Sequence, residues 1–221
     1  MRSRIPGAVD ATARSAIVYR SKMLIVEAAV GRLALLAPGG SNDVNIPMLR
    51  FARETARSRG ASVHALRWEI GSEELRRQMM SVPLGRIPVS VAQMVHDQAA
   101  AALAQLATSG GSPVVFGKSL GSVAADVVAD RGLAAVWFTP LLTNPETVAA
   151  IQRSDAPCLL VGGTADPWWD RDIALSLTSN IVEIPGADHA MRVAGQTPNA
   201  DTIPRELTTS VERFLDLVWP S

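Results

Sequence analysis

Residues 111–123 read GSPVVFGKSLGSV, a stretch that permits two incompatible interpretations. Its GKS fragment at 117–119 fits either a phosphate-binding loop or a serine nucleophile. A phosphate-binding loop needs G-x-x-x-x-G-K-[ST], because free backbone N–H groups must wrap the phosphates. The position five residues before Gly117 is Ser112, and residues 113–116 form an apolar run that is typical of a buried strand. The sequence therefore argues against a nucleotide-binding loop.

The second interpretation is a nucleophile elbow, a sharp turn that presents a serine between a strand and a helix. Residues 117–121 read GKSLG and supply the G-x-S-x-G pattern directly after the apolar run. The flanking glycines have a steric reason, because the serine backbone is strained and the chain on either side passes close to neighbouring backbone. Residues 122–130 carry apolar side chains at helical spacing. We therefore expect strand, turn and helix in that order, with Ser119 at the turn.

Apolar β-type runs alternate with helical patterns along the rest of the chain. Strands are expected at 33–37, 61–68, 113–116, 133–140, 156–166 and 180–186, and helices at 47–59, 89–107, from about 171, and at 203–218. Residues 16–30 are expected to form one or two edge strands. This alternation predicts an α/β fold in which a mostly parallel central sheet is covered by helices on both faces.

The composition fits a protein with one buried core and no net charge that would attract a charged partner. The chain has 221 residues, of which 48% are hydrophobic, so we expect a single domain over 1–221, with 1–13 as a flexible tail. Lys plus Arg and Asp plus Glu are balanced at 21 each, which argues against nucleic acid and anionic membranes as partners. No apolar stretch has the length of a signal peptide or a membrane span, which predicts a cytoplasmic protein.

Cys158 is the only cysteine in the chain. A single cysteine excludes an intramolecular disulfide, fits a reducing compartment and rules out a cysteine-based zinc site. Because Cys158 lies in the apolar run APCLLVGG, we expect it to pack within a strand rather than to act as a nucleophile.

A serine nucleophile needs a base that takes its proton, and the chain has three histidines. His64 lies in an expected strand and His96 in an expected helix, both before the serine, so we interpret them as packing or surface residues. His189 follows the last expected strand, in the loop PGADHAM. His189 is therefore the candidate base.

The acid that orients this base should lie on a loop after a strand between nucleophile and base. Asp166 does so at the end of CLLVGGTAD, at the carboxyl edge of the expected sheet. Asp170 and Asp172 fall at the start of the next expected helix, where the backbone dipole stabilises a carboxylate without any catalytic role. Asp188, beside the candidate base, is expected to order its own loop.

Three motifs together resemble those of the α/β-hydrolase superfamily. In chain order they are FGKSLGS as the elbow, VGGTADPW as the acid strand and loop, and PGADHAM as the histidine loop. The resemblance covers residue 33 to the end of the chain. It implies a catalytic triad of Ser119, Asp166 and His189.

The resemblance also implies an open site. Lidded members carry a helical cap before the acid strand, whereas the interval 139–156 has only 18 residues here, enough for one short helix. In this respect the chain is similar to compact, capless members that are dienelactone-hydrolase-like or carboxylesterase-like. A dienelactone hydrolase proper would carry cysteine at position 119, so the sequence departs from that activity.

The superfamily further implies an oxyanion hole made of two backbone N–H groups. The first follows the nucleophile and belongs to Leu120. The second comes from the loop APGGSND, with Gly40 as the expected donor and Gly39 or Ser41 as alternatives. This loop carries Pro-Gly where His-Gly is common in the superfamily.

Aromatic side chains near the expected site can wall a substrate pocket or pack over the end of the sheet. The candidates for such a pocket are Trp168, Trp169 and Phe138. Segment 73–90 is interpreted either as a flap with Met79 and Met80 facing inward or as a plain surface connection. Lys118, beside the nucleophile, either attracts an acidic substrate or has a structural or solvated role.

These residues predict a serine hydrolase that cleaves a small ester or thioester through an acyl-enzyme, without a metal or cofactor. The expected partner is a small-molecule substrate, whose acyl and leaving groups stay open, as does the oligomeric state. Three alternatives are an acyltransferase with the same triad, a catalytically silent binding protein with this fold, and the nucleotide binder considered first.

Overall fold

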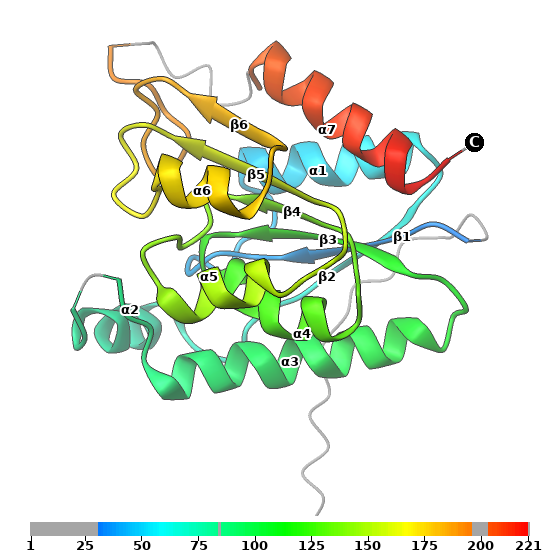
Figure 1. Cartoon of the computed structure of the whole chain (residues 1–221). Helices are drawn as coiled ribbons and strands as arrows, with labels where there is room; N and C mark the ends of the chain where they lie inside the picture. The colour runs from blue at the N-terminus through cyan, green and yellow to red at the C-terminus, as the bar shows by residue number, and fades with distance from the viewer. Residues whose placement is uncertain (1–30, 84, 196–202, 221) are drawn as a thin grey trace, which may run out of the picture.

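A computed structural model describes residues 31–83, 85–195 and 203–220 of the chain. Its centre is a twisted sheet that separates two layers of helices (Figure 1). The flexible tail expected at 1–13 and the edge strands expected within 16–30 lie outside the described residues.

Within the residues that the structure describes, the sheet has six strands in the order β2-β1-β3-β4-β5-β6, and every neighbouring pair is parallel. The strands are β1 (Leu33–Ala37), β2 (Ser62–Ala65), β3 (Pro113–Lys118), β4 (Ala135–Phe138), β5 (Cys158–Gly163) and β6 (Ile181–Ile184). The predicted mostly parallel sheet is confirmed. From β1 the chain first adds β2 on one side and then β3 on the other, so a crevice opens at the carboxyl ends of β1 and β3.

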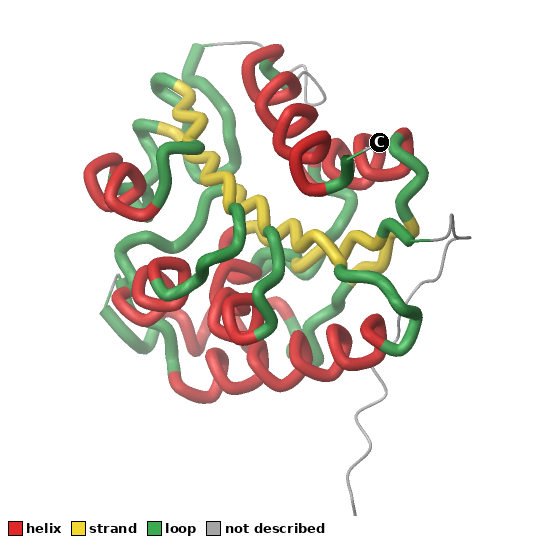
Figure 2. The backbone as a smooth tube through the Cα atoms, turned by 45° about the vertical axis from the view of Figure 1, so that its right-hand side comes forward, coloured by secondary structure: helices red, strands yellow, loops and turns green. Residues whose placement is uncertain are grey.

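Helices cover both faces of the sheet, as predicted (Figure 2). One face is covered by α1 (Pro47–Ser58) and α7 (Arg205–Val218). The other face carries α3 (Val89–Ala107), the 3₁₀ turn η1 (Ser119–Ala124), α4 (Ala125–Asp130), α5 (Pro145–Gln152) and α6 (Arg171–Leu177). The remaining helix, α2 (Ser72–Met80), follows β2 and contributes Leu75 to the core on this second face.

Successive residues of each central strand enter opposite cores, because side chains alternate across a sheet. In β3, Val115 packs under α3 and α4, whereas Val114 and Phe116 pack under α1 and α7. Both cores exclude water, so the central strands are apolar apart from Lys118 at the carboxyl end of β3. This explains why these strands are continuous apolar runs in the sequence.

Several elements differ from the sequence expectations: α2 was not predicted as a helix, and β5 ends at Gly163 rather than at 166. β2 ends at Ala65, although the pattern predicted a strand as far as Trp68. There the chain leaves the sheet, and the Trp68 indole donates a hydrogen bond to the carbonyl of Pro38 at 2.9 Å instead of continuing the strand. The helix after the elbow begins with the tighter 3₁₀ turn η1 before it becomes α4.

The connection between β4 and β5 contains only the short helix α5, so no cap domain covers the carboxyl edge of the sheet. This agrees with the length of the interval in the sequence. Within the ranges that the structure describes, no helix combines the length and the apolar character that crossing a membrane requires.

Candidate active site

A strained turn presents Ser119 at the carboxyl end of β3. Its φ of 53° lies in the left-handed region, which costs a residue with a Cβ about 1–2 kcal/mol. A Cβ on Gly117 would lie 2.4 Å from the Trp137 ring. A Cβ on Gly121 would lie 2.2 Å from the carbonyl oxygen of Ala37. Close packing therefore requires both glycines of the motif.

Three side chains form a continuous hydrogen-bonded chain at this edge of the sheet. Ser119 Oγ lies 2.7 Å from His189 Nε2, and His189 Nδ1 lies 2.8 Å from Asp166 Oδ2. Ser119 follows β3, Asp166 follows β5 and His189 follows β6, and the carboxyl ends of parallel strands meet at one edge. The structure thus brings together the three residues that the sequence analysis selected.

The carboxylate of Asp166 is buried and held in one orientation. Its side chain has no exposed area, and Oδ1 accepts a hydrogen bond from the backbone N–H of Trp168 at 2.9 Å. Oδ2 therefore accepts from Nδ1–H of His189, which leaves Nε2 unprotonated and facing the hydroxyl of Ser119. In this tautomer the imidazole can take the serine proton.

Two of the three competing acidic residues, Asp170 and Asp188, have structural partners of their own. Asp170 caps α6, since its side chain accepts a hydrogen bond from a backbone N–H in the first turn of that helix at 2.9 Å. Asp172 is exposed in the same turn. Asp188 Oδ1 accepts from the backbone N–H groups of Ala190 and Arg192 at 2.8 and 2.9 Å, and so orders the histidine loop.

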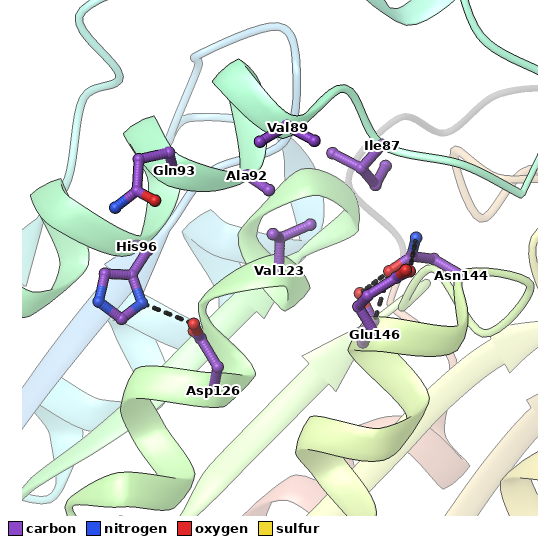
Figure 3. Close-up of a pocket in the computed structure, with 10 residues that line it drawn as sticks. Ile87, Val89, Ala92, Gln93, His96, Val123, Asp126, Asn144 and Glu146 are labelled. Atoms are coloured by element: carbon purple, nitrogen blue, oxygen red, sulfur yellow. Dashed lines mark hydrogen bonds and ion pairs between the residues drawn. The ribbon is translucent and has the colours of Figure 1, made fainter.

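A cavity that does not include Ser119, Asp166 or His189 is lined by the pair His96–Asp126 (Figure 3). His96 Nδ1, on α3, lies 2.6 Å from Asp126 Oδ2, on α4. The cavity measures about 290 Å³, and no member of the hydrogen-bonded chain lines it. His96 is thus a partly exposed residue outside the hydrogen-bonded chain, in agreement with the surface role expected from the sequence, whereas its partner Asp126 was not predicted.

The remaining histidine and the cysteine lie in strands. His64 is buried in β2, and this burial lowers the pKa of its imidazole below the usual value. Cys158 is half-buried in β5, and burial raises the pKa of its thiol, which disfavours the reactive thiolate. Both positions agree with the packing roles expected from the sequence.

The backbone N–H groups expected to bind an oxyanion belong to residues of the nucleophile's own cavity. Leu120 is the second residue of η1, and the first N–H groups of a helix have no acceptor within it. Gly40 lies in the loop after β1, the strand that pairs with β3 up to Gly117. Leu120, Gly40 and Ser119 all line one cavity. The oxyanion hole stays a prediction that this placement supports.

Asn42 and Trp68 hold the loop that contains Gly40, and the sequence analysis did not identify this pair. Asn42 has a φ of 57°; its Nδ2 donates to the carbonyl of Trp68 at 2.8 Å, and its Oδ1 accepts from the Trp68 N–H at 2.7 Å. The Trp68 indole reaches back to the carbonyl of Pro38. The loop is thereby tied to the segment after β2. The one sequence signal that could have pointed to Asn42 is its residue type, because asparagine adopts a positive φ more readily than most residues.

We expect Asn42→Ala to lower the free energy of unfolding by about 2–4 kcal/mol. The change removes two hydrogen bonds, leaves the backbone groups of Trp68 without these partners, and keeps a Cβ at positive φ without the amide that compensates for it. Urea unfolding curves measure the effect. Asn45→Ala is the matched control, since Asn45 is exposed, and it should change stability by less than about 0.5 kcal/mol. Equal midpoints for both variants would contradict the role of Asn42.

The cavity in front of Ser119 is largely apolar and measures about 410 Å³. Ser119 lines this cavity together with Gly40 and Ser41 of the loop after β1. The other lining residues are Leu75, Arg76, Met79, Leu120, Leu141 and Trp168. Arg76 is the only charged residue among them. Such a cavity has the size and character of a small-ligand site.

Two of the predicted pocket residues lie elsewhere, while Trp168 lines the cavity. Phe138 has no exposed area and packs in the core under α1 and α7. Trp169 packs on Gly162, and its indole donates to Glu183 Oε2 at 2.7 Å. Phe138 and Trp169 are therefore corrections to the predicted pocket, because both fill space over the sheet.

The segment 73–90 contributes to the wall of this cavity rather than forming a plain surface connection. Its helix α2 supplies Leu75, Arg76 and Met79 to the lining. Met80 is 78% exposed, so its predicted inward orientation is wrong.

No family model and no curated protein matches the sequence, but the fold is similar to that of solved structures. An α/β serine hydrolase without a lid from Xanthomonas campestris superposes with a TM-score of 0.60 at 15% identity, covering 90% of this chain and 88% of that one. A dienelactone hydrolase from Anabaena variabilis gives 0.61 at 19% identity, covering 87% and 88%. Esterase 2 from Thermogutta terrifontis, phosphorylated by paraoxon, gives 0.60 at 20% identity, covering 89% and 88%.

These similarities establish the fold. The chain has an α/β-hydrolase fold, with a parallel sheet of six strands in the described residues and no cap between β4 and β5. The fold predicted from the three sequence motifs is confirmed.

Proposed function

We propose that this chain is a serine hydrolase that cleaves a small ester or thioester through an acyl-enzyme. One observation carries the proposal: the hydrogen-bonded chain from Ser119 through His189 to Asp166, with distances of 2.7 and 2.8 Å. A hydroxyl, a base and an oriented carboxylate in this sequence are the groups that activate a serine nucleophile. The structural likeness to a lidless serine hydrolase and to an esterase supports the reaction class.

In the first step, Ser119 Oγ attacks the carbonyl carbon of the substrate while its proton moves to His189 Nε2. The imidazolium that forms is stabilised by the Asp166 carboxylate. The carbonyl oxygen becomes an oxyanion and accepts hydrogen bonds from the backbone N–H groups of Leu120 and Gly40. Each such donor contributes about 2.7–4 kcal/mol to stabilisation of the transition state.

In the second step, the bond from the carbonyl carbon to the leaving oxygen or sulfur breaks. The leaving alcohol or thiol takes the proton from His189 Nε2, and the acyl group stays on Ser119 as an ester. A water molecule then gives a proton to Nε2 and attacks the acyl carbon. The acid product leaves as the proton returns to Ser119 Oγ, which restores the starting state.

The cavity supports a small substrate with an apolar part. Its walls are mostly aliphatic, and Trp168 offers a flat aromatic surface suited to an acyl chain or an aryl group. The volume of about 410 Å³ lies at the lower end of the range for small-molecule sites.

A fluorophosphonate probe tests the proposal directly. Intact-mass analysis of the native chain should show one adduct, which Ser119→Ala should abolish. Ser176→Ala is the control variant, because Ser176 is exposed on α6, and it should form the adduct like the native chain. A folded native chain without an adduct would refute the proposal and favour a silent binding protein. Turnover of a chromogenic ester should persist in a chelator, since every proposed step uses residues of the chain.

Product analysis separates hydrolysis from acyl transfer. With the native enzyme and an activated ester, the free acid should be the main product even when an alcohol or amine is added. A product mixture dominated by the new ester or amide would reassign the chain as an acyltransferase with the same acyl-enzyme.

A further inference from the structure

Lys118 connects the strand of the nucleophile to the loop of the base. It is the last residue of β3 and directly precedes Ser119. Its Nζ donates a hydrogen bond to the backbone carbonyl of His189 at 3.1 Å. Within the described ranges, two side-chain hydrogen bonds join β3 or η1 to the histidine loop: this one and the bond of Ser119 with the imidazole. The nucleophile and the base therefore have a second, independent connection.

The stem of Lys118 also runs close beside the loop from which the second oxyanion donor is expected. A Cβ placed on Gly39 would lie 3.3 Å from Lys118 Cδ and 3.3 Å from Ser119 Cβ, so the lysine stem runs close beside this loop. Lys118 does not line the cavity in front of Ser119. It thus touches the supports of the site without facing the substrate, which argues against the idea that it attracts an acidic substrate.

The ammonium group keeps its charge in this position. Burial lowers the pKa of Lys118 to about 8, while the nearby carboxylates of Asp166 and Asp188 act in the opposite direction. The group is therefore mostly protonated at pH 7, and its bond to the His189 carbonyl is charge-assisted. A buried ammonium is costly in free energy, and an apolar side chain of the same length would avoid this cost.

We propose that Lys118 is a positioning residue that fixes the carbonyl of His189, and with it the imidazole, in register with Ser119. The inference rests on the proposed hydrolase function. The imidazole is joined through a single CH₂ group to the Cα next to the carbonyl that Lys118 holds. A shift of the loop therefore moves Nε2 relative to the serine hydroxyl. A misplacement of about 1 Å in a catalytic group can cost about 100-fold in rate.

The variant Lys118→Met keeps most of the apolar stem and removes both the donor and the charge. We expect kcat to fall about 10- to 100-fold, with KM changed less than about 2-fold because Lys118 lies outside the substrate cavity. Lys118→Arg keeps a charged donor and should recover part of the loss. Arg192→Met is the matched control, because it removes an exposed cation from the same loop. It should leave kcat near the native value.

A readout that does not depend on turnover separates this proposal from the hydrolase proposal. In the native chain, the Nδ1 proton of His189 should give a far-downfield NMR signal, since it is held between the imidazole and Asp166. The variant His189→Gln assigns the signal, and His96→Gln identifies the signal of the other histidine–aspartate pair. In folded Lys118→Met the signal of His189 should shift or broaden.

The possible outcomes decide the role of Lys118. An unchanged NMR signal in Lys118→Met, or a native kcat, would overturn the inference. A rise in KM at constant kcat would overturn it too, because it would place the lysine on the substrate. If the native chain fails to react with the fluorophosphonate, the hydrolase proposal fails, yet the NMR comparison still shows whether Lys118 holds the imidazole.

Discussion

Asp166→Asn is expected to lower kcat about 10⁴-fold while the fold persists. The reason lies in the hydrogen bonds of the carboxylate. Oδ1 accepts from the Trp168 N–H, so an asparagine would keep its carbonyl oxygen there and turn its NH₂ group towards His189 Nδ1. Nδ1 would then have to be the unprotonated nitrogen. Nε2 would carry the proton and could no longer take one from Ser119.

Steady-state turnover of an activated ester measures this effect, and thermal unfolding verifies the fold. Asp170→Asn is the matched control, because Asp170 caps α6 through a side-chain oxygen that asparagine also has. Its turnover should lie within about 2-fold of the native chain. If Asp166→Asn kept more than a tenth of native kcat, the tautomer argument and the assignment of the acid would both be wrong.

Gly121→Ala is expected to produce the largest loss of stability at the elbow, about 3 kcal/mol or more. The new Cβ would lie 2.2 Å from the carbonyl oxygen and 2.8 Å from the carbonyl carbon of Ala37. These are backbone atoms of β1, which is paired on both sides by β2 and β3. β1 cannot move away from the new Cβ without disturbing its pairing with both neighbouring strands. Relief of the clash therefore costs free energy in the sheet.

Chemical unfolding of the purified variants tests this expectation. Gly71→Ala is the control, because Gly71 has a φ of −67° and a Cβ there would meet no atom within 4 Å. It should cost less than about 1 kcal/mol, mostly through the N-terminal cap of α2. Failure of Gly121→Ala to accumulate as folded protein would agree with the expected strain. A midpoint equal to that of Gly71→Ala would show that β1 can give way.

The fold and the meeting of Ser119, Asp166 and His189 at one edge of the sheet could be predicted because their signals are local. Each buried strand is a short apolar run, and each chemical group follows directly after such a run, as Ser119 and Asp166 do. Parallel pairing then brings residues at the ends of separate strands to one edge without further information. The orientation of large side chains was harder to predict. Phe138 and Trp169 occupy suitable positions in the sequence, but packing over the sheet removes both from the pocket.

The supports of the site could not be predicted, because they join segments that are distant in the chain. Asn42 and Trp68 are separated by 26 positions, and Lys118 and His189 by 71. No periodicity or short motif marks such pairs, and each requires the strand order of the folded sheet. Lys118 could be noticed in the sequence because it precedes Ser119. Only its bond to the His189 carbonyl favours a role in positioning the histidine loop over a role in attracting an acidic substrate.

The wall formed by α2 also has a consequence for how this protein can change. Ser119, Asp166 and His189 each follow a strand of the central sheet, whereas α2 lies outside the sheet and lines the cavity with three side chains, those of Leu75, Arg76 and Met79. In the proposed hydrolase, part of the wall that meets the substrate is thus carried by a different element from the reacting groups. Libraries confined to this helix are therefore expected to alter which substrates are accepted while the three reacting side chains keep their positions, which makes α2 the natural starting point for redesign.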